Sequence, residues 1–157
     1  MILGLFFSVI SKLKTVVDYL PESIEGKRSL IEPVIGKKLG DNLPISEELI
    51  SVPAIIMMAS ATCSTCHDSL EEFLQRNDQE SIPFACYLLS NDEEYLSFVS
   101  KYKEEFPIYQ INKEVLLNFG IEMTPSFLLT NNKGIVEAVN YFTDPIIDLY
   151  KKNNKEI

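Results

Sequence analysis

The chain has few of the residue types on which several functional classes depend. It contains no tryptophan, one histidine and three cysteines among 157 residues. Three cysteines do not make the disulfide-rich scaffold of a small secreted domain. A four-ligand zinc site would need all of the following to converge: Cys63, Cys66, Cys86 and His67. Because His67 directly follows Cys66, its spacing is unlike that of paired zinc ligands, and we expect no metal site.

Basic residues are also scarce. Fourteen Lys and Arg stand against 23 Asp and Glu, so the net charge is −9. Nucleic acids and anionic membrane surfaces attract basic patches, so nucleic acid is not an expected partner. The composition is 46% hydrophobic, which is enough for one sizeable core in a chain of this length. We expect a single folded domain over residues 34–157, preceded by a separate segment of residues 1–33.

The most informative motif that is present is Cys63-Ser64-Thr65-Cys66. Residues 53–60, before the motif, form an apolar run of strand length. After it, apolar residues repeat at helical spacing, at Leu70, Phe73 and Leu74. A buried strand is therefore predicted to deliver Cys63 to the start of a helix.

A cysteine at a helix start is suited to thiol-disulfide exchange. We expect Thr62 or Ser64 to cap the helix, whose positive dipole end favours a thiolate over a thiol. The thiolate is the species that attacks a disulfide. Cys63 is therefore the candidate catalytic nucleophile and Cys66 the resolving cysteine.

Other interpretations of this motif stay open. The two cysteines also fit a structural disulfide in a binding or assembly module. With His67 they fit the C-x-x-C-H pattern of haem attachment, with Met123 as the distal ligand, although alternating strand and helix segments argue against haem. His67 either shares the helical face of Cys63, where an imidazolium favours a thiolate, or faces solvent without a role.

Two further positions separate chemistry from packing. Thr124-Pro125 opens an apolar strand, where a proline cannot donate to the sheet. This proline either serves a purpose at the strand start or belongs to an ordinary loop. Cys86 shares a strand face with Phe84 and Leu88, which predicts a core residue because free cysteine is among the most buried residue types.

Strand, CxxC, helix and a later Thr-Pro at a strand start together resemble the thioredoxin superfamily, over about residues 34 to 152. Residues 120–136 are similar to the TlpA-like and MauD-like branches. The resemblance implies an α/β thioredoxin-like fold, with a mixed central sheet flanked by helices, and no cofactor beyond a redox-active Cys63–Cys66 disulfide. It also implies that Pro125 is cis and packs beside the CxxC, and that the backbone of Thr124 docks an extended substrate.

The chain departs from the family pattern at two positions. Thr62 stands where many members have tryptophan, and Met57 stands where reductant-type thioredoxins have a buried acid that accepts a proton from the resolving thiol. The direction of electron transfer therefore stays open. The expected partners are a cysteine-containing protein substrate and a second redox protein.

The remaining segments complete an α/β pattern. We expect a helix from Asp92, a short helix over 113–119 closed by Gly120, and a hairpin that turns at 131–134. Asp144 is expected to cap a final helix that has Pro145 at its first position.

Residues 1–20 carry apolar residues at helical spacing. They fit either an amphipathic helix packed on the domain or on a partner, or the tail of a membrane anchor of which most would be missing. Their longest apolar stretch is shorter than the roughly 20 residues that cross a bilayer. With the MauD-like resemblance, this segment favours membrane association on the outer face of a bacterium, and the cytoplasm is the alternative.

Overall fold

The computed structural model describes residues 33–41, 43–102 and 105–154. The predicted anchor-like segment of residues 1–20, and membrane association through it, lie outside this range. Among the described residues, no helix combines the length and the apolar character needed to cross a bilayer. The elements in chain order are η1 Leu39–Asp41, α2 Glu47–Ile50, β1 Ala54–Ser60, α3 Ser64–Glu80, β2 Phe84–Leu89, α4 Asp92–Tyr102, β3 Ile108–Ile111, α5 Lys113–Phe119, β4 Ser126–Thr130, β5 Val136–Asn140 and α6 Thr143–Asn154.

The strands form one mixed five-stranded sheet in the order β3-β2-β1-β4-β5. The pairs β1–β2 and β2–β3 are parallel, whereas β4 runs antiparallel to both β1 and β5. β1 is the central strand and is buried from Ala54 to Ala59, which explains its unbroken apolar sequence. The predicted mixed sheet flanked by helices is confirmed.

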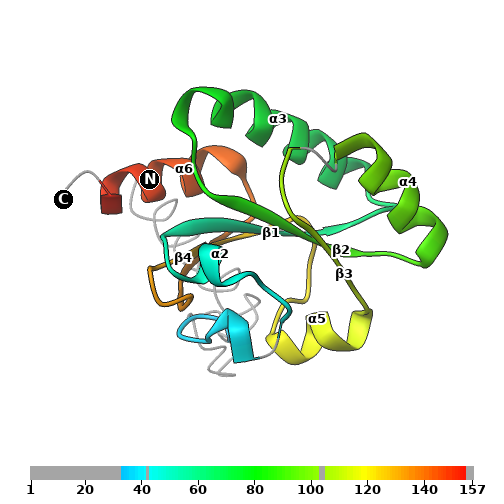
Figure 1. The fold of residues 1–157 in the computed structure, drawn as a ribbon, viewed down its shortest axis with the longest axis horizontal. Coiled ribbons are helices and arrows are strands. Elements are labelled where there is room, and N and C mark those ends of the chain that lie inside the picture. Colours follow the sequence, from blue (N-terminus) through cyan, green and yellow to red (C-terminus); the bar gives the residue numbers. More distant parts are fainter. Residues whose placement is uncertain (1–32, 42, 103–104, 155–157) are drawn as a thin grey trace, which may run out of the picture. The chain divides into compact units, whose positions relative to one another are not determined.

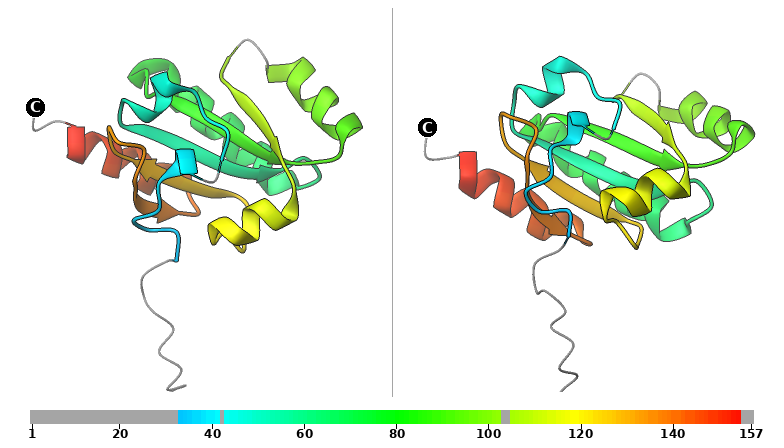
Figure 2. Two further views of the ribbon diagram at one scale, coloured as in Figure 1. Left: turned by 60° about the horizontal axis from the view of Figure 1, so that its bottom comes forward. Right: turned by 90° about the horizontal axis from the view of Figure 1, so that it is seen from below.

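Helices cover both faces of this sheet (Figures 1 and 2). One face packs against α3, α4 and α6, in a core that includes Met57, Cys66, Phe73, Phe127 and Ile146. The other face packs against α2, α5 and the chain before α2, in a core that includes Val34, Leu39, Met58, Tyr87 and Phe119. Alternate residues of β1 therefore serve opposite cores, as the period of a strand requires.

Local signals place most boundaries correctly. α5 spans Lys113–Phe119 and ends at Gly120, whose φ of 99° is the left-handed conformation that glycine adopts most readily. The hairpin turns over residues 131–134, as predicted. The expectation for α6 is wrong, because the helix begins at Thr143 and Asp144 lies within its first turn. The carboxylate of Asp144 pairs with Arg76 of α3 instead of capping the helix.

Candidate active site

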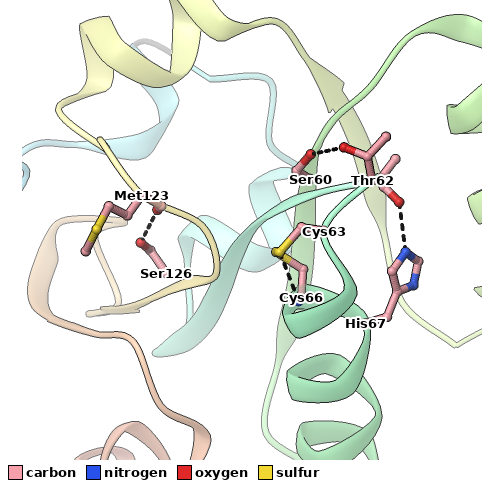
Figure 3. Close-up of a disulfide and its surroundings, with 8 residues drawn as sticks. Ser60, Thr62, Cys63, Cys66, His67, Met123 and Ser126 are labelled. Atoms are coloured by element: carbon pink, nitrogen blue, oxygen red, sulfur yellow. Dashed lines mark hydrogen bonds between the residues drawn. A yellow bond between two sulfur atoms is a disulfide. The ribbon is translucent and has the colours of Figure 1, made fainter.

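The cysteine pair lies at the junction of β1 and α3 (Figure 3). Cys63 is the N-cap residue of α3, and its sulfur accepts a hydrogen bond from the backbone N–H of Cys66 at 3.1 Å. The expectation that Thr62 or Ser64 caps this helix is therefore wrong. The hydroxyl of Thr62 instead contacts that of Ser60 at 3.3 Å.

The two cysteines differ in exposure. They form a disulfide with their Cα atoms 5.2 Å apart. Cys66 is only 2% exposed and belongs to the core beneath α3, whereas Cys63 is half-buried at the edge of that core. Of the two cysteines, Cys63 is therefore the more exposed to solvent.

Thr124 and Pro125 lie at the same end of the sheet as the cysteines. The peptide bond between them is cis. β4 begins at the next residue, Ser126, which is the antiparallel partner of Met58 near the end of β1. The hydroxyl of Ser126 donates to the carbonyl oxygen of Met123 at 2.6 Å (Figure 3). The structure therefore brings all four predicted site residues to the same end of the sheet, where β1 ends and β4 begins. Their roles stay predictions.

His67 makes two defined contacts, so it is not a histidine that simply faces solvent. Its Nε2 lies 2.9 Å from the carbonyl oxygen of Ala61, which can only accept, and Nε2 therefore donates. Its ring packs against Phe98 of α4, with 5.5 Å between the centroids. The imidazole lines a groove of about 400 Å³ between α3 and α4.

No protein-family model and no curated protein matches this sequence, whereas solved structures do. The thioredoxin domain of a thiol-disulfide oxidoreductase from Bacteroides vulgatus superposes with a TM-score of 0.60 at 16% identity, over 75% of this chain and 90% of that one. A thio-disulfide isomerase from Thermus thermophilus superposes with a TM-score of 0.58 at 17% identity, over 73% of this chain and 87% of that one. A secreted disulfide oxidoreductase of Mycobacterium tuberculosis superposes with a TM-score of 0.56 at 17% identity, over 70% of this chain and 89% of that one.

The chain has a thioredoxin-like fold. The expectation of this fold, drawn from the strand, CxxC and Thr-Pro pattern, is confirmed. At these identities the likeness concerns the fold, so the chemistry has to be argued from the residues of this chain.

In this thioredoxin-like domain, the interior next to the CxxC is apolar. Met57, six residues before Cys63, is fully buried in the same core as Cys66. Its neighbour across the β1–β2 pair is Cys86, which is also fully buried. Burial raises the pKa of the Cys86 thiol to about 12, so this thiol stays protonated and unreactive. The prediction that Cys86 is a core residue is confirmed.

The arrangement gives no support to the metal alternatives. Within the described ranges, no group of three or more His, Cys, Asp or Glu side chains is placed to hold a metal ion. Covalent haem attachment would need the Cys63–Cys66 disulfide to be open, and this alternative is not tested by the structure.

Sequence reasoning missed an ionic contact beside the groove. Glu71 of α3 accepts hydrogen bonds from Lys101 Nζ at 2.6 Å and from the hydroxyl of Tyr102, both in α4. These hydrogen bonds, that of Lys101 above all, hold the pKa of Glu71 below its ordinary value. The only sequence signal was Glu71 itself, four residues after His67 and so on the same helical face. Its partners come from about thirty residues further along the chain.

Proposed function

We propose that the protein exchanges a disulfide or dithiol with cysteine pairs of other proteins, through Cys63 and Cys66. The difference in exposure between the two cysteine residues carries this proposal. An attacking sulfur has to meet a foreign disulfide, whereas a resolving sulfur has to reach only its neighbour, and Cys63 is half-buried while Cys66 is 2% exposed.

The reaction balances without an external cofactor. In the reducing direction, the Cys63 thiolate attacks one sulfur of the substrate disulfide, so a mixed disulfide forms and one substrate thiolate leaves. The Cys66 thiolate then attacks the Cys63 sulfur, the mixed disulfide breaks, and the second substrate thiolate leaves. Two electrons pass to the substrate, and the Cys63–Cys66 disulfide remains. Oxidation of a substrate dithiol follows the same steps in reverse.

The start of α3 supports a thiolate at Cys63. The Cys63 sulfur accepts the N–H of Cys66, and a hydrogen bond to the charged form of a group favours that form. The first turn of this 17-residue helix carries no acidic side chain, so no carboxylate there opposes the thiolate. Met57 cannot accept a proton from the buried Cys66 thiol. This proton therefore has to leave through water or the substrate thiolate.

We further propose that the backbone of Thr124 pairs with an extended substrate segment beside Cys63. Pro125 has no N–H and Thr124 lies in the loop just before β4, which leaves the Thr124 backbone outside the sheet ladder. Disulfide peptides N-methylated at single positions near the reactive cysteine test this pairing. Methylation at one of these positions should slow exchange by about tenfold through the loss of one hydrogen bond. Equal rates for all methylated peptides would contradict the docking role.

The proposed partners are a cysteine-containing substrate protein and a second redox protein that restores the starting state. The proposed location is the outer face of a bacterial membrane, with attachment through residues 1–20. The family resemblance and the apolar pattern of that segment support it. Cell fractionation of the tagged full chain, compared with a chain lacking residues 1–20, tests this location. Recovery of both chains in the cytoplasm would contradict it.

Substituting each of the two cysteines in turn tests the proposed activity. In turnover of a disulfide-bonded peptide with a dithiol reductant, Cys63→Ser should abolish exchange, because the attacking sulfur is gone. Cys66→Ser should also stop turnover but should accumulate a mixed disulfide with the peptide, visible by mass spectrometry. Cys86→Ala is the matched control and should keep the wild-type rate. Unchanged turnover in Cys63→Ser would rule out Cys63 as the attacking sulfur, whereas a binding module would keep its partner binding in that variant.

A further inference from the structure

The turn that presents Cys63 is fixed at Ala61 from two directions. The backbone N–H of Ala61 donates to the carbonyl oxygen of Leu89 in β2 at 3.0 Å. Its carbonyl oxygen accepts from Nε2 of His67 in α3 at 2.9 Å. One bond ties the turn to the sheet and the other ties it to the helix, two residues before the attacking sulfur.

The imidazole is itself held in place. Its ring packs against Phe98, which is 6% exposed and belongs to the core under α4. In Figure 3 the His67 ring points away from the sulfurs of Cys63 and Cys66. An influence of His67 on Cys63 therefore passes through the backbone of the turn rather than through contact with the sulfur.

The hydrogen bond to Ala61 does not depend on the charge of His67. Nε2 carries a hydrogen both in the neutral tautomer that donates here and in the imidazolium. The charged groups around the ring are Glu71 on its own helix and, from α4, three residues that line the groove with it, Glu93, Glu94 and Lys101. Whichever charge state the ring holds beside these groups, it keeps the Nε2 hydrogen that binds Ala61.

We propose that His67 is a positioning residue, whose Nε2–H holds the Ala61 carbonyl and thereby fixes the Cys63 sulfur at the start of α3. This inference rests on the proposed exchange function. It assigns His67 a mechanical role through a hydrogen bond, in place of the electrostatic role that its spacing from Cys63 first suggested. A donor at this position is sufficient, and a positive charge is not needed.

Two substitutions separate the donor from the ring. His67→Gln keeps an N–H donor but loses the aromatic contact with Phe98, whereas His67→Phe keeps a ring and loses the donor. Exchange of the reduced full chain with a disulfide peptide should fall by about tenfold in His67→Phe, the order expected for one hydrogen bond. His67→Gln should recover most of the wild-type rate at every pH from about 5 to 8. Glu72→Gln, an exposed change on the same helix, is the control.

Every other pattern overturns the inference. Equal rates for all variants mean that the bond does not matter. Equal losses in the two His67 variants, or a loss in His67→Gln alone, mean that ring packing matters instead. If the wild type itself shows no exchange, the proposed function fails first. A readout independent of activity and of the variants is the tautomer of His67 in the wild type, measured by ¹⁵N NMR at about pH 8. The neutral ring should carry its hydrogen on Nε2, and a hydrogen on Nδ1 alone would overturn the inference.

Discussion

Met58 in β1 and Ser126 in β4 are antiparallel partners. β1 therefore ends, and β4 begins, at the same end of the sheet, although the two residues are far apart in sequence. The chain leaves β1 towards Cys63 at this end and enters β4 from Thr124 and Pro125. This single register relationship brings together two motifs that lie far apart in the chain.

Cys86 should matter for stability and not for exchange. Its side chain is fully buried, and burial keeps its thiol protonated. Cys86→Ser should lower the free energy of unfolding by about 1–3 kcal/mol, because the serine hydroxyl would be buried among apolar side chains without a hydrogen-bond partner. Cys86→Ala should cost less. Denaturant unfolding measures both, and a loss of exchange in a folded Cys86→Ala protein would contradict a purely structural role.

Glu71 should make stability depend on pH in the acidic range. Its folded pKa lies below the ordinary value of 4.5. Above that value both the folded and the unfolded carboxylate are ionised, and the full stabilisation is present. As the pH falls through 4.5 towards the folded pKa, the unfolded state binds the proton first and the stabilisation is lost.

Glu71→Gln should therefore destabilise the protein at pH 7 by about 0.5 kcal/mol, a small effect because the Glu71 side chain is 45% exposed and screened by solvent. The difference from wild type should disappear near the acid end of the titration. Urea unfolding at a series of pH values measures it, with Glu72→Gln as the control. A difference that grows as the pH falls would be the opposite of what the paired carboxylate predicts.

Gly120 should resist substitution because of its backbone conformation. It ends α5 at a φ of 99° and precedes the loop that carries Thr124. Gly120→Ala should lower the free energy of unfolding by about 1–2 kcal/mol, the cost of a left-handed residue with a side chain. Gly36→Ala is a matched comparison, because Gly36 also has a positive φ but an added Cβ would meet no neighbour. Similar losses in thermal unfolding would assign the cost to the backbone in both, and no loss in either would contradict it.

Much of the fold was predictable because the local signals were strong. The apolar run of β1, the glycine after α5 and the turn at residues 131–134 each specify one conformation. β3 was missed because Ile108–Ile111 is short and mostly half-exposed, without a clear alternation. The start of α6 was misplaced because Asp144-Pro145 has the pattern of a helix cap and first position, whereas the helix already begins at Thr143. The carboxylate of Asp144 pairs with Arg76, a partner from another helix.

The chemistry of the site was predictable only in part. The spacing of Cys63 and Cys66 in the sequence is enough to identify them as candidates. Cysteine is not among the usual N-cap residues, so the sequence favoured Thr62 and Ser64 as helix caps instead. The contacts of His67 depend on the path of the turn at Ala61 and on Phe98, about thirty residues away. Such contacts exist only once α4 has packed beside α3.

The most direct test of the account is the alkylation of the reduced full chain by iodoacetamide at neutral pH, with the modified cysteines identified by peptide mass spectrometry. Cys63 should react first and several times faster than Cys66, while Cys86 stays unmodified until the protein is unfolded. If Cys66 reacts first, or if both thiols of the CxxC stay unmodified, Cys63 is not the attacking sulfur and the proposed function is wrong.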